Sequence, residues 1–182
     1  YRTIDREAGE SLWQRGLTLR SRLGGTIRGI TENLDYIADL GFNCLYLNPL
    51  FVAGEYHKYD ILDYRHVCPN MGTDEDFREL VAAAHQKGLR VVIDGVFNHC
   101  SWQFFAFDDV VRNGESSRYK DWFYELQFPV IRPETAEAVP SHRRFAYERK
   151  MPKLNSSNPE VRAYFCEVGR YWIEQFHVDG WR

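Results

Sequence analysis

The sequence of 182 residues is about as long as one domain, and its 44% hydrophobic and 15% aromatic residues are ample for a buried core. Its net charge of −3 argues against nucleic acid and acidic membranes as partners, and no apolar run approaches the roughly 20 residues that span a bilayer. The four widely spaced cysteines and the lack of an apolar signal region favour reduced thiols in a cytoplasmic protein.

Three segments repeat one plan in chain order: a capped amphipathic helix, a break, and a short apolar strand. Thr73 and Asn158 suit helix N-caps, and Gly41 and Gly88 suit left-handed helix stops. Apolar residues at helical spacing predict the buried faces of the helices. These residues are Ile30, Leu34, Ile37 and Ala38, then Phe77, Leu80, Val81 and Ala84, then Val161, Phe165, Val168 and Trp172. The predicted strands are "NCLYLN" at 43–48, "LRVVID" at 89–94 and "VDGWR" at 178–182.

The strands are continuous apolar runs, which is typical of strands covered on both faces. Because they alternate with helices, they predict an α/β fold with right-handed βαβ units and a parallel sheet. These patterns leave open whether the sheet is doubly wound or a (β/α)8 barrel. No GxGxxG motif follows a strand, and no phosphate-binding loop with its lysine is present, so nucleotide binding is not expected.

Residues 101–157 form a long excursion between the second strand and the third helix, and they are rich in aromatic residues. A structureless loop of that length is uncommon in a compact domain, so we predict an inserted subdomain. Aromatic rings interleaved with Arg and Asp suit carbohydrate, since flat rings stack on sugar faces. The alternative is that most of these rings form the small core of the insertion itself.

Polar side chains follow the first two strands at the edge where parallel α/β folds bind ligands. Asp94, Asn98 and His99 follow the strand "RVVI". Asn48 and Pro49 end the preceding strand, and the segment behind them carries His57, Tyr59, Asp60 and Asp63. Taken singly, a strand-end Asp often caps a turn, and a lone His is usually structural. Their clustering favours a ligand site.

Four segments resemble the α-amylase family, glycoside hydrolase family thirteen. They are "DGVFNH" at 94–99, "HKYDILDY" at 57–64, residues 24–51, and "DGWR" at 179–182. The sequences of the motifs "NPLF", "HKYD" and "DGVFNH" are most similar to those of the neopullulanase, cyclomaltodextrinase and maltogenic amylase branch. The resemblance covers nearly the whole chain in the family's order.

The resemblance implies a partial (β/α)8 barrel with about strands 2 to 4. Residues 1–100 would be the first part of the barrel, 101–157 the inserted domain B, and 158–182 helix 3 and the start of strand 4. The first strand is hinted at only by Tyr1–Ile4.

The resemblance also implies roles for individual residues in retaining cleavage of α-glucosidic bonds. Tyr59 would stack on the sugar, His57 would line the same subsite, and His99 would hydrogen-bond the sugar hydroxyls. Arg182 would orient the nucleophile and keep it ionised. Asp94 would be structural.

Asn98 corresponds to a calcium ligand in many family members. No cofactor is required for the chemistry, and calcium stays open because its other ligands would lie in the insertion or be absent.

Retaining cleavage needs two carboxyl groups roughly 5–5.5 Å apart. The family's nucleophilic Asp and acid Glu would follow Arg182, so this chain alone is expected to be inactive. The parent would act on maltooligosaccharides, cyclodextrins, pullulan or starch, without nucleic acid or membrane as partner, and a homodimer of the parent is left open.

Two alternatives remain. One is a non-catalytic amylase-like binding or partner protein. The other is a metal-dependent barrel hydrolase using His57, Asp94 and His99, although the spacings HxH and HExxH are absent.

Overall fold

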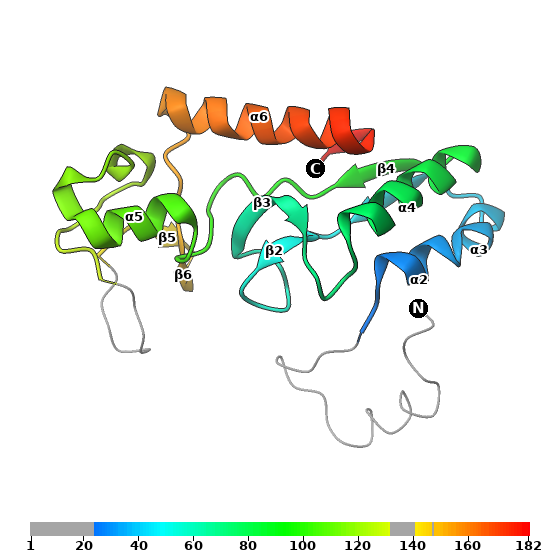
Figure 1. Cartoon of the computed structure of the whole chain (residues 1–182), viewed down its shortest axis with the longest axis horizontal. Coiled ribbons are helices and arrows are strands. Elements are labelled where there is room, and N and C mark those ends of the chain that lie inside the picture. The colour runs from blue at the N-terminus through cyan, green and yellow to red at the C-terminus, as the bar shows by residue number, and fades with distance from the viewer. Residues whose placement is uncertain (1–23, 132–140, 147) are drawn as a thin grey trace, which may run out of the picture. The chain divides into compact units, whose positions relative to one another are not determined.

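The computed structural model describes residues 24–131, 141–146 and 148–182. The contacts of the chain divide it into two compact units, whose helices and strands are labelled in Figure 1. Within the described residues, the first unit comprises 24–50, His66–Asp94 and Ile173–Arg182, and the second comprises Phe51–Arg65 and Gly95–Trp172. The boundaries predicted from the sequence stay a prediction, and the hint of a first strand at Tyr1–Ile4 lies outside the described residues.

The first unit contains a parallel sheet with the strand order β1-β4-β7. Its strands are β1 (Cys44–Leu47), β4 (Arg90–Ile93) and β7 (Gly180–Trp181). Leu47 pairs with Ile93, and Ile93 pairs with Trp181, so the carboxyl ends of the three strands are aligned. Strands that are consecutive in the repeated plan are neighbours in the sheet. This confirms the predicted parallel α/β unit, and in the described part of the chain its three strands do not close into a barrel.

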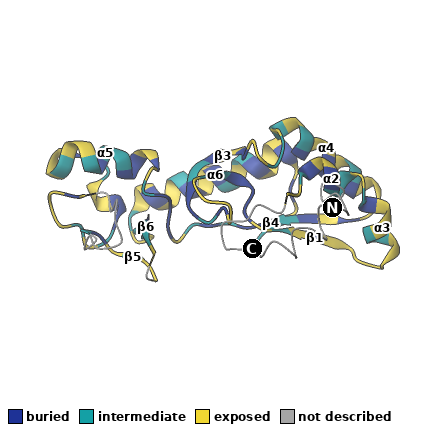
Figure 2. Ribbon diagram, turned by 90° about the horizontal axis from the view of Figure 1, so that it is seen from below, coloured by how far each residue is buried: buried dark blue, intermediate teal, exposed yellow. Residues whose placement is uncertain are grey.

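Helix α4 (Asp74–Gln86) begins and ends as its sequence predicts. The Thr73 hydroxyl accepts from the Asp76 amide at 3.0 Å, and the Asp76 carboxylate accepts from the Thr73 amide at 2.8 Å, which completes a capping box. Gly88 has φ +72°, the left-handed stop that glycine adopts without strain. The predicted apolar stripe is buried, as the dark residues along α4 indicate (Figure 2): Phe77, Leu80, Val81 and Ala84.

The first predicted helix is instead two short helices, α2 (Ile27–Thr31) and α3 (Leu34–Asp39). At the break, the Thr31 hydroxyl donates to the Ile27 carbonyl at 3.2 Å, and the Asn33 amide donates to the Gly29 carbonyl at 2.7 Å. Side chains that bond the backbone in this way compete with the helical ladder. The prediction of one continuous helix was therefore wrong in detail, although Leu34 is buried as expected.

Helix α6 (Pro159–Phe176) follows its predicted cap, since the Asn158 side chain accepts from the Glu160 amide at 2.8 Å. All four predicted stripe residues of this helix are buried: Val161, Phe165, Val168 and Trp172. None of the helices in the described ranges is long and apolar enough to cross a membrane.

The second unit has more secondary structure than the sequence predicted. Strands β2 (Phe51–Ala53) and β3 (Ile61–Val67) form a two-stranded sheet. Within 101–157 lie α5 (Phe105–Asn113), the 3-10 helices η1 (Gly114–Ser116) and η2 (Lys120–Trp122), and the antiparallel strands β5 (Arg144–Phe145) and β6 (Glu148–Pro152). Among the described residues of this segment, four aromatic residues are buried, namely Phe104, Phe107, Trp122 and Phe123, whereas Phe105 and Phe145 are exposed.

Tyr64 on β3 is the centre of the aromatic core of the second unit and is fully buried. Five other rings lie with centroids 5.0 to 6.5 Å from its ring: Phe51, Phe97, Phe104, Tyr164 and Phe165. Its hydroxyl donates to the carbonyls of Val96 and His99 at 2.9 and 3.0 Å. The core thus holds the backbone that follows β4, where several predicted site residues lie.

Candidate functional site

In the first unit, three side chains meet at the carboxyl ends of the strands; we call Tyr46, Asp94 and Arg182 the strand-end cluster. Asp94 follows β4 and Arg182 follows β7, and the register of these strands makes them neighbours. The Arg182 Nη1 lies 3.2 Å from both Asp94 carboxylate oxygens. The Tyr46 hydroxyl donates to Asp94 Oδ2 at 2.8 Å, and the guanidinium carbon of Arg182 lies 5.8 Å from the Tyr46 ring centroid.

The strand-end cluster combines a buried carboxylate with an accessible guanidinium cation. The side chain of Asp94 is 3% exposed, whereas that of Arg182 is 65% exposed. The charge-assisted hydrogen bond between them compensates the negative charge of the buried carboxylate and restrains the guanidinium. Arg182 can therefore meet a second anion from the solvent side.

In the second unit, the loop from 54 to 60 carries His57 and Tyr59 and is anchored by Asp60. The buried Asp60 carboxylate accepts from the Glu55 amide at 3.0 and 3.1 Å. A Cβ on Gly54 would lie 2.6 Å from Asp60 Oδ2, so the close approach requires glycine. Burial raises the pKa of Asp60, and the hydrogen bond from the Glu55 amide acts to lower it. Asp60 thus has a structural place in this loop.

The side chains of His57 and Tyr59 lie next to each other on this loop. The Tyr59 amide donates to His57 Nδ1 at 3.0 Å, and their ring centroids are 6.1 Å apart. Asp63 lies farther along on β3, where its carboxylate accepts from the Arg65 amide at 2.8 Å. His57 and Tyr59 line a pocket of about 470 Å³ together with Phe145, Ala146, Glu148 and Met151.

His99 lies beside this pocket, stacked on the Phe145 ring with centroids 4.3 Å apart and planes at 23°. His99 is 4% exposed. Burial lowers the pKa of His99 to about 4; a contact with the Tyr59 backbone acts in the opposite direction, and the nearby Lys153 charge lowers it further. The imidazole is therefore neutral near pH 7 and can take part in hydrogen bonds without carrying charge.

Asn98, His99 and Lys153 form a second polar group, which we call the hairpin cluster. The Lys153 ammonium donates to Asn98 Oδ1, and Asn98 Nδ2 lies 3.1 Å from His99 Nδ1. The backbone supports this arrangement, because His99 and Lys153 form an antiparallel bridge and the Leu154 amide donates to the Asn98 carbonyl at 3.0 Å. The structure thus brings His99 together with Asn98.

The calcium ligand set implied for Asn98 does not fit this arrangement. A metal ligand must offer an oxygen lone pair to the cation, and Asn98 Oδ1 already accepts from the Lys153 ammonium. No group of three or more His, Cys, Asp or Glu side chains that could hold a metal ion occurs among residues 24–131, 141–146 and 148–182.

Sequence reasoning missed Tyr46, Phe145 and Lys153. Tyr46 lies in the predicted strand 43–48, and its neighbours in the sheet become known only with the strand register. Phe145 is one of many aromatic residues of the insertion, and no local pattern distinguishes it from the others. Lys153 had no signal, since it lies 55 residues from Asn98 along the chain and no local pattern indicates their contact.

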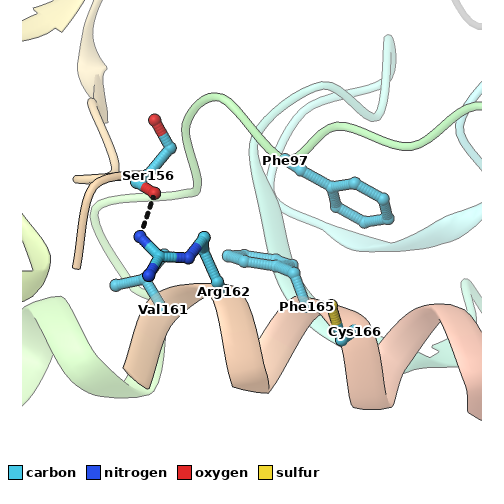
Figure 3. Close-up of a pocket in the computed structure, with 6 residues that line it drawn as sticks. All are labelled: Phe97, Ser156, Val161, Arg162, Phe165 and Cys166. Carbon is cyan, nitrogen blue, oxygen red and sulfur yellow. Dashed lines mark hydrogen bonds between the residues drawn. The ribbon is translucent and has the colours of Figure 1, made fainter. Parts of the chain in front are cut away.

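A second pocket of about 300 Å³ lies in the second unit (Figure 3). The Phe97 and Phe165 rings lie near each other there, tilted by 41° with centroids 5.1 Å apart, and Arg162 donates to the Ser156 carbonyl at 3.3 Å. None of its six lining residues is a carboxylate or an imidazole. We assign it no chemistry.

Comparisons with known proteins place the chain in a family. The family model described as "Alpha amylase, catalytic domain" matches residues 5–182. A cyclomaltodextrinase of Geobacillus thermopakistaniensis is 47% identical over 91% of this chain and 27% of its own length. The intracellular maltogenic amylase of Bacillus subtilis is 47% identical over 87% of this chain and 26% of its own length.

Solved structures similar to this chain also include α-glucan hydrolases. The ligand-free cyclic α-maltosyl-(1→6)-maltose hydrolase of Arthrobacter globiformis superposes with a TM-score of 0.79 and 43% identity, over 86% of this chain and 34% of the other. The chain spans about a quarter of the length of the curated relatives that it matches. Because the family model covers nearly all of its residues, the chain belongs to the α-amylase family and forms part of the family's catalytic (β/α)8 barrel.

Proposed function

We propose that the complete protein is a glycoside hydrolase that cleaves α-glucosidic bonds in maltooligosaccharides, cyclodextrins, pullulan or starch by retaining double displacement. Family membership carries this proposal, and the names of the relatives, cyclomaltodextrinase and maltogenic amylase, indicate the substrates. The activity belongs to the complete protein, because the chain spans only about a quarter of these relatives.

The pocket of the second unit would bind the sugar at the cleaved bond. The Tyr59 ring would stack on the sugar, and His57 would line the same subsite. His99 would donate a hydrogen bond to sugar hydroxyls, for which a neutral and buried imidazole is suited. The Phe145 ring, which is 46% exposed, would add an apolar surface at the pocket wall.

The strand-end cluster would serve the nucleophile. The partly exposed Arg182 would pair with the nucleophilic carboxylate and keep it ionised by the nearby positive charge. Asp94 and Tyr46 would hold the guanidinium in place. Retaining cleavage needs a nucleophile and an acid roughly 5–5.5 Å apart, and we place both after Arg182 in the complete protein. The 182-residue chain would then be inactive alone.

We extend the proposal to cellular location and assembly. Four described cysteines are free thiols, and one relative is named an intracellular maltogenic amylase, which together support a cytoplasmic protein. A homodimer of the complete protein remains part of the proposal and is tested by its mass in solution.

The test measures reducing sugar released from maltotriose, pullulan and β-cyclodextrin by the complete gene product and by the 182-residue chain. We expect an active gene product and an inactive chain. His99→Asn in the complete product removes a proposed donor to the sugar and should lower kcat by roughly 10²-fold. His85→Gln is the matched control, because His85 lies on α4 and contacts Asp179 rather than the pocket.

Other outcomes contradict the proposal in distinct ways. If the complete product binds β-cyclodextrin and cleaves none of the three substrates, the protein is an amylase-like binding protein. If the 182-residue chain cleaves them, the catalytic carboxylates lie within it, and Asp60, Asp63 and Asp94 would be tested first. If His85→Gln and His99→Asn lose equal activity, His99 has no special role.

A further inference from the structure

The hairpin cluster contains a lysine where the family resemblance leads one to expect a cation ligand set. The Lys153 ammonium donates to Asn98 Oδ1. The position of Lys153 is fixed by its backbone, because its amide donates to the Arg143 carbonyl at 2.9 Å and it bridges His99 in an antiparallel pair. The ammonium is thus brought to Asn98 by the bridge that directly follows β6.

The ammonium decides which way the Asn98 amide points. Lysine has only N–H donors, so the atom that faces Lys153 must be the acceptor oxygen. The amide nitrogen then faces His99, at 3.1 Å from Nδ1. The amide oxygen and nitrogen have similar shapes, so shape alone does not distinguish the two orientations. The assignment rests on the fact that the Lys153 ammonium can only donate.

The orientation of Asn98 in turn decides the tautomer of His99. The Asn98 Nδ2 group can only donate, so His99 Nδ1 must accept and the single proton of the neutral ring lies on Nε2. His99 Nε2 is buried and has no hydrogen-bond partner among the described residues. Stacking on Phe145 fixes the plane of the ring.

We propose that the Lys153 ammonium occupies the place of a metal cation on Asn98 and, through the Asn98 amide, fixes His99 as the Nε2–H tautomer. Lys153 is a positioning residue, because it acts on His99 only through Asn98. The use of the Nε2–H group toward a sugar hydroxyl rests on the proposed function, whereas the tautomer does not. The hairpin cluster therefore binds no calcium ion.

The test records the tautomer of His99 by long-range proton–nitrogen NMR of the ¹⁵N-histidine-labelled 182-residue chain, without substrate. We expect the Nε2–H pattern in the wild type and in Lys153→Arg, which keeps a donor-only cation. In Lys153→Glu the carboxylate accepts from the Asn98 amide nitrogen, so the amide turns and its oxygen faces His99. The His99 pattern should then change to Nδ1–H.

Calcium provides a second readout that needs no activity. We expect the wild type to show the same melting temperature with Ca²⁺ and with a chelator. Lys153→Glu supplies a carboxylate beside Asn98, so Ca²⁺ should raise its melting temperature and return His99 to the Nε2–H pattern. Lys150→Met is the matched control: Lys150 lies on β6, shortly before Lys153, but pairs with Glu55 at 3.1 Å, and its loss should change neither readout.

Three results would overturn the proposal. They are an Nδ1–H pattern in the wild type, an unchanged Nε2–H pattern in a folded Lys153→Glu chain without Ca²⁺, and a rise in the wild-type melting temperature on adding Ca²⁺. If Lys153→Glu does not fold, the wild type and Lys153→Arg decide, since both must show Nε2–H. The His99 tautomer can change with the residue at position 153 while the complete gene product cleaves no α-glucan. In that case the proposed function is wrong, but the effect of Lys153 on His99 through Asn98 is confirmed.

Discussion

The strand-end cluster and the hairpin cluster each hold a buried polar side chain, but by different means. Asp94 of the strand-end cluster is held by groups that the parallel register of the sheet aligns. His99 of the hairpin cluster is held by Asn98 and Phe145, which come from irregular chain and a two-residue strand. The first depends on a repeated ladder of hydrogen bonds, and the second on a few single contacts.

This difference leads to different weaknesses. In the sheet, several backbone hydrogen bonds between successive residue pairs hold the strands together. The strand-end cluster should therefore tolerate the loss of one side-chain hydrogen bond. The hairpin cluster relies on isolated bridges, such as that between His99 and Lys153, and on the core beneath them. Changes in the aromatic core of the second unit should therefore have the larger effects.

The largest effect is expected for Trp172→Ala. Trp172 is fully buried, its indole donates to the Tyr64 carbonyl at 2.7 Å, and its ring lies 5.0 Å from that of Phe51. Removing the ring leaves a cavity and an unpaired carbonyl, so the free energy of unfolding should fall by about 3–5 kcal/mol in urea titrations. Ile173→Ala is the control, since Ile173 is 48% exposed, and an equal loss there would refute this account.

A smaller effect is expected for Tyr64→Phe, which keeps the ring and removes the hydroxyl. The Val96 and His99 carbonyls both lose their buried donor, so the free energy of unfolding should fall by about 1–3 kcal/mol. Amide hydrogen exchange should become faster at residues 96–100. Tyr124→Phe removes an exposed hydroxyl that lies 3.4 Å from Ser157 and should leave both measurements nearly unchanged.

The strand-end cluster should respond less to the loss of its cation. In Arg182→Met, Asp94 still accepts from Tyr46, and the lost guanidinium was largely solvated. The free energy of unfolding should fall by about 1 kcal/mol. Arg112→Met, which removes an ion pair with Asp108 from a side chain that is 74% exposed, should cost less. A loss of several kcal/mol in Arg182→Met would show that single contacts govern this cluster too.

The same contrast explains how far the sequence predicts the structure. The apolar runs before Asp94 and Arg182 predict two parallel strands, and consecutive parallel strands are usually neighbours. The stripes of α4 and α6, the Thr73 cap and the glycine stops at Gly41 and Gly88 were predictable because each is a local rule. The sequence therefore nearly suffices to predict that Asp94 and Arg182 are neighbours.

The remaining features depend on contacts that no local rule contains. The break between α2 and α3 arises from side-chain bonds of Thr31 and Asn33, which compete with a helix-like apolar pattern. The partner of Asn98 is 55 residues away along the chain. Family resemblance implies a cation ligand at Asn98, but only the fold reveals that a lysine lies against it.

The smallest expected effect concerns the other end of β7, where Asp179 docks this strand on β4. The Asp179 carboxylate accepts from the Val91 amide at 2.7 Å and lies 2.7 Å from His85 Nε2. Burial acts to raise the pKa of Asp179, but the Val91 amide and His85 outweigh it, helped by the charge of Arg90, so the pKa lies below its ordinary value of 3.8.

A lowered pKa fixes the sign of the pH dependence. Above the ordinary pKa, Asp179 is ionised in both the folded and the unfolded chain, and its stabilisation is complete. As the pH falls below about 4, the unfolded chain takes up the proton first, so the free energy of unfolding falls until the folded carboxyl is protonated too. Asp179→Asn should be less stable than the wild type at pH 6, and the difference should shrink as the pH falls toward 3. If the difference stays constant across this range, the ionised carboxylate is not what docks β7, and the position of Arg182 depends on the backbone ladder alone.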